Sequence, residues 1–183
     1  MSMSIIGFKA QNHPQQPVSD EVDDRGTTAE DFAWFNTLGP FTLDVAAAPH
    51  NAKCDRYFTV RDDGLRQSWS GERVWCNPPY SNIGAWVEKA WQEHETADGI
   101  AMLLPANRCE QVWWQRWVET RRDEPTSPLC VTFLPGRMRF IRAGSTRVGM
   151  NERPPFGCCL LTWGLGYLAP RPEPTLFNPE PRD

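Results

Sequence analysis

The chain has 183 residues, of which 40% are hydrophobic and 11% aromatic, enough for one packed core and too few for two independent domains. No stretch approaches the roughly 20 apolar residues of a membrane span, and the N-terminus lacks the basic start and apolar run of a secretion signal, so a cytoplasmic location is expected. The formal net charge of −4 excludes a uniformly basic surface of the kind that coats many nucleic-acid-binding proteins.

The two ends of the chain differ in composition from its middle. Residues 1–25 combine Asn, Gln, Pro, Ser and acidic residues without a hydrophobic period, which is typical of a flexible leader. Residues 169–183 are rich in proline and poor in core-forming residues. We therefore expect one domain over residues 26–168, between a leader and a tail.

Short apolar runs alternate with helix-like segments in the middle of the chain. The predicted strands are Phe41–Val45, Val74–Cys76, Ile100–Leu104, Leu129–Leu134 and Phe156–Trp163. The predicted helices have apolar residues three or four apart and span Glu30–Leu38, Ile83–His94 and Glu110–Thr120, and Ser81-Asn82 can cap the second. Several strands are continuously apolar, as expected when both faces are covered. The alternation predicts an α/β fold with a mainly parallel sheet and an antiparallel C-terminal edge.

The six cysteines show neither a CxxC spacing nor a His/Cys cluster of the zinc type, and Cys158 and Cys159 are direct neighbours. This pattern favours reduced thiols over a disulfide framework. It predicts no metal site.

The segment Asn77-Pro78-Pro79-Tyr80 follows a predicted strand, at the sheet edge where ligands of open α/β sheets bind. The exocyclic amine of a base is a poor nucleophile, because its lone pair is delocalised into the ring. Two hydrogen-bond acceptors can draw the nitrogen toward a tetrahedral shape, and the Asn77 side chain and the Pro78 carbonyl can be those acceptors. Consecutive prolines remove two backbone donors and fix φ, so that carbonyl is presented rigidly.

Tyr80 adds an aromatic ring on which an extruded base can stack. The chemistry implies a sulfonium methyl group as the electrophile. The alternative interpretation is a strand that ends in a proline turn before a helix. The tetrapeptide alone does not select DNA, since it is also known in methyltransferases of protein glutamine and of RNA guanine.

Several further stretches carry a family resemblance. They are FTLDVAA (Phe41 to Ala47), NAKC followed by Tyr57 (Asn51 to Cys54), DGL with Trp69 (Asp63 to Leu65), WCNPPYS (Trp75 to Ser81), LLP (Leu103 to Pro105) and GRMRF (Gly136 to Phe140). With them the chain resembles the phage-type N6-adenine DNA methyltransferases from about Thr27 to Trp163. The resemblance implies a Rossmann-like methyltransferase fold, S-adenosylmethionine as the methyl donor, and double-stranded DNA with a flipped adenine as the substrate.

The resemblance also suggests which residues contact the donor: Thr28, Asp44, Ala46, Ala47, Tyr57, Phe58 and Asp63. Asp44 would face its ammonium, and the two alanines would admit its methionine part. The two aromatic residues would flank its adenine, and Asp63 would accept a hydrogen bond from the adenine amine. Thr28 would contact its carboxylate, although this chain lacks the Thr-Pro pair of many relatives. Structural roles compete with these assignments, namely a strand-end aspartate that accepts backbone bonds, core alanines and core aromatics. The interval from Asp44 to Asn77 is short, so we expect an abbreviated strand or helix there.

Basic residues gather in the second half of the chain. Residues 1–100 carry 8 Lys and Arg against 15 Asp and Glu, whereas residues 101–183 carry 11 against 8. The candidate DNA contacts are Asn107 and Arg108 after the third strand, and Arg137, Arg139 and Arg142 in the arginine-rich stretch 137–153. Solvated loop charge is the alternative for these arginines. For Trp113, Trp114 and Trp117, which have helical spacing, core packing is favoured over DNA stacking.

Three other functions stay open on sequence grounds. Cytosine N4 methylation uses equivalent amine chemistry. RNA or protein-glutamine methylation is disfavoured because DVAAAPH lacks the usual glycine-rich first loop. A non-catalytic DNA-binding or decoy protein of the same fold would not require an intact Asn-Pro-Pro-Tyr segment.

Overall fold

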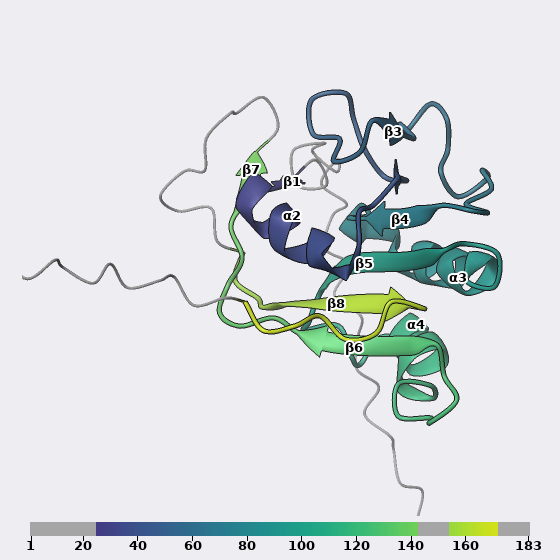
Figure 1. Cartoon of the computed structure of the whole chain (residues 1–183). Coiled ribbons are helices and arrows are strands. Elements are labelled where there is room, and N and C mark those ends of the chain that lie inside the picture. Colours follow the sequence, from purple (N-terminus) through teal and green to yellow (C-terminus); the bar gives the residue numbers. More distant parts are fainter. Residues whose placement is uncertain (1–24, 143–153, 172–183) are drawn as a thin grey trace, which may run out of the picture.

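The computed structural model describes residues 25–142 and 154–171 (Figure 1). Its strands are β1 (Arg25–Thr27), β2 (Leu43–Asp44), β3 (Arg56–Tyr57), β4 (Arg73–Cys76), β5 (Gly99–Pro105), β6 (Leu129–Phe133), β7 (Phe140–Arg142) and β8 (Cys158–Trp163). Its helical elements are α2 (Ala29–Phe35), the 3-10 turns η1 (Asn36–Leu38) and η2 (Tyr80–Asn82), α3 (Ile83–Glu93), α4 (Val112–Trp114) and the π-helical turn η3 (Gln115–Glu119). Most of the predicted leader and tail lies outside the described residues.

Six strands form one sheet in the order β3-β2-β4-β5-β8-β6. The first four run parallel to one another, and β8 runs antiparallel to both β5 and β6. The predicted α/β class with a mainly parallel sheet is confirmed. The C-terminal strand is antiparallel, as predicted, and it inserts between β5 and β6 so that β6 forms the edge.

Hydrophobic side chains cover both faces of this sheet, which explains the continuous apolar runs. Along β5, Ile100, Met102 and Leu104 face α3 and α4, whereas Ala101 and Leu103 face α2. Figure 1 shows α2 on one side of the sheet and α3 and α4 on the other. Because both faces of the sheet are buried, the positions that remain for polar side chains are at the ends of the strands.

A separate two-stranded ribbon joins distant parts of the chain. Strand β1 pairs antiparallel with β7, and Thr27 lies opposite Phe140. Neither strand was predicted, because each has three residues and no apolar run. The ribbon places the first part of the arginine-rich stretch, at Phe140–Arg142, beside the residues that precede α2.

Other local differences from the predicted elements have physical causes. Within residues 45–72, all of them described, β3 is the one strand and no α-helix occurs, so the expected abbreviation between Asp44 and Asn77 is confirmed. The third predicted helix divides into α4 and η3. Asn82 precedes α3 but makes no side-chain capping bond, so its expected capping role was wrong.

The described residues also answer three questions about composition. All six cysteines are free thiols, and Cys76, Cys158 and Cys159 are buried. No described helix has both the length and the apolar character needed to cross a membrane. The described residues contain no cluster of His, Cys, Asp and Glu suited to a metal ion.

Candidate active site

Asp44 ends β2 at the carboxyl edge of the sheet, and its side chain is only 3% exposed. One carboxylate oxygen accepts a hydrogen bond from the Ala46 N–H at 3.3 Å and the other from the Lys53 N–H at 3.0 Å. Burial raises the pKa of Asp44 to about 6, and the two backbone bonds and the Lys53 charge oppose that rise. These two bonds therefore hold the loop of residues 45–53 against the end of β2. At neutral pH the buried carboxylate of Asp44 is mainly ionised.

The two neighbouring threonines before α2 have different roles. The Thr28 hydroxyl caps α2: it accepts from the Asp31 N–H at 3.0 Å and donates to the Asp31 carboxylate at 2.9 Å. The Thr27 hydroxyl is buried, with the residue 1% exposed, and has no hydrogen-bond partner. An unsatisfied buried hydroxyl is costly in a native structure. Of the two threonines, Thr27 is therefore the candidate for binding a polar ligand.

A small cavity brings these groups together between β1, β2 and β4. Its lining residues are Gly26, Thr27, Asp44, Ala46, Asn51, Lys53, Trp75 and Asn77. The cavity measures about 20 Å³, which is room for a water-sized polar group. A buried carboxylate can pair with an ammonium, and an unsatisfied hydroxyl can donate to a carboxylate. These two groups therefore match the amino-acid end of S-adenosylmethionine in chemistry, while the cavity itself has room for one polar group.

The other predicted donor contacts lie along the same edge. Ala46 lines the cavity, and the Ala47 N–H donates to the Phe58 carbonyl at 3.0 Å. Tyr57 lies in β3 and is half-buried, whereas the Phe58 ring packs against the core on the α3 side. The contact of Phe58 with that core is the structural role that competes with a contact to the donor.

Asp63 lies in an exposed turn after β3 with φ of 53°, the one positive φ among the described residues other than glycine. The next residue, Gly64, packs so closely that a Cβ there would lie 2.2 Å from the Val45 carbonyl oxygen. A left-handed backbone beside a tight approach is unfavourable and often marks a functional turn. The turn therefore lies against the end of β2, where the resemblance places the donor.

The Asn-Pro-Pro-Tyr segment leaves the sheet at the end of β4, next to β2. Trp75 pairs with Asp44 across the two parallel strands, and Asn77 lines the same cavity as Asp44. Pro78 is buried, and Pro79 has φ of −58° and ψ of 128° before the turn η2 begins at Tyr80. The prolines thus change the chain direction at the sheet edge and hold the segment against it.

Phe156 is a candidate that the sequence did not indicate. Its ring packs against that of Tyr80, with centroids 6.1 Å apart and planes at 61°. The residue comes just before β8 and is half-buried. The sequence predicts it as the first residue of the strand Phe156–Trp163, because an apolar run gives no signal that its first residue leaves the sheet. Two aromatic rings therefore pack together beside the Asn-Pro-Pro-Tyr segment.

Three connections meet beside these rings. The Ala106 N–H donates to the Gly157 carbonyl at 2.8 Å, and the Leu134 N–H donates to the Cys158 carbonyl at 3.0 Å. The first bond positions the segment that carries Asn107 and Arg108, and the second positions the segment that carries Arg137 and Arg139. The fold thereby brings the predicted DNA contacts to the edge that holds Tyr80.

These DNA candidates differ in exposure. Asn107, Arg137 and Arg139 are exposed, and the buried Met138 anchors the two arginines. Arg108 is half-buried, and its Nε is buried with no hydrogen-bond partner. The Arg142 backbone pairs with Arg25 in the ribbon, and its side chain lies outside the described part. The rest of the arginine-rich stretch, residues 143–153, also lies outside it.

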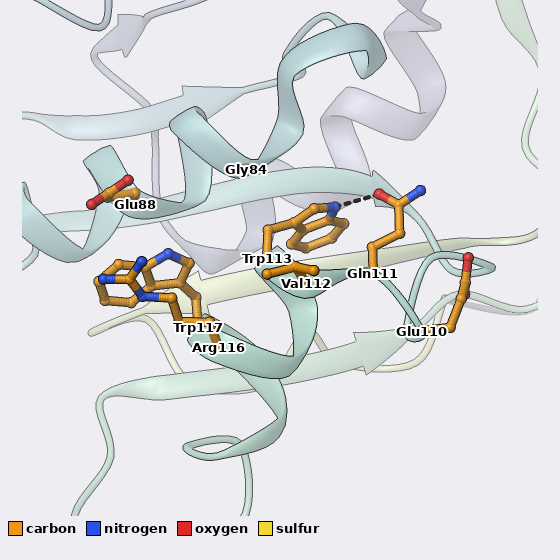
Figure 2. Close-up of a pocket in the computed structure, with 8 residues that line it drawn as sticks. All are labelled: Gly84, Glu88, Glu110, Gln111, Val112, Trp113, Arg116 and Trp117. Atoms are coloured by element: carbon orange, nitrogen blue, oxygen red, sulfur yellow. Dashed lines mark hydrogen bonds between the residues drawn. The ribbon is translucent and has the colours of Figure 1, made fainter. Parts of the chain in front are cut away.

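A groove of about 600 Å³ lies between α3 and α4, and none of the predicted site residues lines it (Figure 2). Trp113 and Trp117 form part of its lining, while Trp114 is buried in the core. The carboxylates of Glu88 and Glu110 also line the groove, which disfavours phosphate there. Core packing of Trp114 agrees with the prediction, and the groove gives no support to DNA stacking on the other two tryptophans.

Comparison with known proteins identifies the family. The family model described as DNA N-6-adenine-methyltransferase (Dam) matches residues 17–163. The DNA N-6-adenine-methyltransferase of Escherichia phage T1 is 37% identical over 70 residues, which cover 38% of this chain and 29% of that protein. The protein of the same name from Haemophilus phage HP1 is 43% identical over 83 residues, which cover 45% of this chain and 48% of that protein. The chain thus aligns with less than half the length of either relative.

Two further likenesses are to proteins with less specific names. Escherichia coli K12 YfdM, provisionally named a methyltransferase, is 42% identical over 69 residues, covering 33% of this chain and 75% of that protein. A solved structure provisionally named an RNA methyltransferase, from Pyrococcus horikoshii, is 14% identical at a TM-score of 0.39, covering 78% of this chain and 75% of that chain; this is too distant to carry an argument. The match over residues 17–163 decides the assignment: the chain belongs to the DNA N-6-adenine-methyltransferase (Dam) family and has a Rossmann-like methyltransferase fold.

Proposed function

We propose that this protein transfers a methyl group from S-adenosylmethionine to the N6 amine of a flipped adenine at specific sites in double-stranded DNA. The observation that carries the proposal is one cavity at the ends of β2 and β4 that is lined by Thr27, Asp44 and Asn77. In this cavity Thr27 and Asp44, which are suited to bind an amino acid, lie beside Asn77, the first residue of the Asn-Pro-Pro-Tyr segment. Membership of the adenine-methylating family supports the choice of substrate.

The amino-acid end of the donor would bind at the buried acid and the unsatisfied hydroxyl. Asp44 would hold the ammonium, and Thr27, rather than Thr28, would donate to the carboxylate. Ala46 lines the same cavity, and its small side chain would let the ligand approach the backbone. When bound, the donor supplies a sulfonium methyl group, which is the electrophile.

The target amine would be activated by two acceptors. The Asn77 Oδ1 and the Pro78 carbonyl would each accept one amine hydrogen, which concentrates the nitrogen lone pair on the side away from both acceptors. Because Pro78 is buried and Pro79 has no N–H, the carbonyl direction is fixed. After methyl transfer the nitrogen is cationic, and it must release one proton to recover the neutral amine.

The flipped base would stack against an aromatic pair. Tyr80 and Phe156 already lie in contact at the sheet edge, and both residues are half-buried. Stacking is worth roughly 1–3 kcal/mol per base, enough to offset part of the cost of unstacking. Exposed Asn107, Arg137 and Arg139, together with Arg108 and Arg142, would contact the duplex around the base.

Mass spectrometry of nucleosides tests the proposal directly. Double-stranded DNA is incubated with the protein and S-adenosylmethionine, digested and examined for methylated bases. We expect N6-methyladenine with the native chain and none with Asn77→Ala. Asn82→Ala is the matched control, because Asn82 is exposed and makes no capping bond. N4-methylcytosine, or transfer only to RNA or protein, would contradict the choice of substrate, and full activity of Asn77→Ala would contradict the mechanism.

A further inference from the structure

The chain turns back after β8 and runs toward α2, on the face of the sheet that α2 covers (Figure 1). Thr162 Oγ1 donates to the Gly166 carbonyl at 2.6 Å, and the Leu168 N–H donates to Thr132 Oγ1 at 3.3 Å. Leu168 is 5% exposed and belongs to the core on the α2 side. These contacts fix the course of residues 164–168, which lie beyond the end of the family match at 163.

The next residues contact α2 through Trp34 near the end of the helix and through the two acids of its first turn, Glu30 and Asp31. The Trp34 indole N–H donates to the Ala169 carbonyl at 3.0 Å, and the Arg171 guanidinium lies 5.1 Å from the centroid of the Trp34 ring. Arg171 also forms an ion pair with Asp31, and Glu30 lies 3.7 Å from the same guanidinium nitrogen. The C-terminal segment is thus held to α2 by three different kinds of contact.

Asp31 connects this attachment to the cavity. The residue is 7% exposed, and its two carboxylate oxygens have different partners, Arg171 on one and the Thr28 hydroxyl on the other. Thr28 caps the helix and is the direct neighbour of Thr27, which lines the cavity. A short path of bonds therefore runs from Arg171 through Asp31 and Thr28 to the proposed carboxylate contact of the donor.

We infer that Arg171 is a positioning residue for the methyl donor, acting through Asp31 and the capped start of α2. The inference rests on the proposed function, because it assumes that the donor binds beside Thr27. Without the guanidinium, Asp31 would be a buried carboxylate that has lost its ionic partner, a costly state that favours movement of the side chain toward water. Such a movement would disturb the Thr28 cap and the position of Thr27.

Calorimetric titration with S-adenosylhomocysteine tests the inference in the full chain. We expect Arg171→Gln to weaken binding about 3- to 30-fold, the range of couplings carried through packed contacts. Arg171→Lys should recover part of the affinity, since it keeps the charge but loses the planar stack on Trp34. Arg122→Gln is the matched control, because Arg122 pairs with Glu119 and Asp123.

A double-mutant cycle separates the proposed path from a general loss of stability. If Arg171 acts through Asp31, the variant with both Asp31→Asn and Arg171→Gln should bind no more weakly than the weaker of the two single variants. Additive losses would overturn the path. If the unaltered chain binds S-adenosylhomocysteine and Arg171→Gln binds it equally well, the inference is overturned but the proposed function is not.

A measurement without any ligand keeps the two proposals distinguishable. Amide hydrogen exchange at Thr27, Thr28 and Asp31 should be faster in Arg171→Gln than in the unaltered chain, and unchanged in Arg122→Gln. Equal exchange in all three proteins would overturn the positioning role. If the unaltered chain bound neither S-adenosylmethionine nor S-adenosylhomocysteine, with or without DNA, the proposed function would fail, and the positioning of a donor would fail with it.

Discussion

The Phe156 ring packs on the Tyr80 ring with 6.1 Å between centroids, and so joins the start of β8 to the segment after β4. This contact crosses β5, the strand that lies between them in the sheet. The two residues are far apart in the sequence, yet their rings form one aromatic surface beside the Asn-Pro-Pro-Tyr segment. The position of Phe156 gives the first prediction.

Phe156→Ala should weaken the binding of an extruded base and leave the donor site intact. A lost stack of roughly 1–3 kcal/mol corresponds to a fall of about 5- to 150-fold in kcat/KM for DNA. Fluorescence of 2-aminopurine at the target position would report the stack independently of turnover. Phe133→Ala is the control, because Phe133 is a 59% exposed phenylalanine on the edge strand β6. Equal activity of the two variants would contradict a role for Phe156 in base binding.

Donor binding should depend on pH through Asp44. Its pKa is raised to about 6 by burial, so the carboxylate is mainly protonated at pH 5 and mainly ionised at pH 7.5. If the ionised form holds the ammonium, the affinity for S-adenosylhomocysteine should be about tenfold lower at pH 5 than at pH 7.5. Titration calorimetry at both pH values measures this ratio, and Asp44→Asn should abolish it. A ratio near one in the native chain would contradict the assignment.

The same ionisation predicts a stability effect of opposite direction. An unfolded aspartate ionises near pH 4, whereas folded Asp44 ionises near pH 6, so the folded state binds more protons between these values. The contribution of Asp44 to the free energy of unfolding therefore falls as the pH rises from about 4 to about 6 and is constant above. Urea unfolding of the native chain and of Asp44→Asn across this range gives the difference. A contribution that rises with pH would show that the folded pKa is lowered.

Thr27 and Thr28 offer a matched pair of substitutions. Thr28→Val removes the cap of α2 and should lower the free energy of unfolding by about 1 kcal/mol. Thr27→Val removes a buried hydroxyl that has no partner, so stability should be unchanged or higher, while affinity for the donor falls. Chemical denaturation and calorimetry measure the two effects. Donor affinity that falls in Thr28→Val and not in Thr27→Val would reverse the assignment of the two roles.

The sequence predicts the central sheet well because its strands are buried on both faces. The runs Ile100–Leu104 and Phe156–Trp163 overlap β5 and β8, whose side chains alternate between two hydrophobic clusters. Strands β1 and β7 stabilise each other although they are far apart in the sequence. No local pattern reveals such a pairing. Local patterns therefore predict elements that carry the core and miss short elements held by distant partners.

The candidate site likewise contains some residues whose positions the sequence predicts and others whose roles it does not. The rule for strand ends predicts that Asp44 and Asn77 lie near each other, and they line one cavity. The sequence cannot decide between Thr27 and Thr28, since only the start of α2 at Ala29 determines which hydroxyl caps the helix. Arg171 gave no signal at all, because its role depends on a chain reversal after β8. Proximity at strand ends is thus predictable, whereas the division of roles between neighbours requires the fold.

Arg137 and Arg139 should contact DNA phosphates. Both are exposed and flank the buried Met138. They lie in the connection between β6 and β7, which is held to β8 by the bond from the Leu134 N–H to the Cys158 carbonyl. Each phosphate contact releases counterions, so changing both arginines to Gln should lower the slope of log affinity against log salt by about 2 and weaken binding to all DNA sequences alike. Fluorescence anisotropy with a labelled duplex at several salt concentrations measures that slope. Arg122→Gln should leave it unchanged, because Arg122 is already paired with Glu119. An unchanged slope in the double variant would identify the two arginines as solvated surface charge, and a loss confined to one DNA sequence would identify them as base contacts.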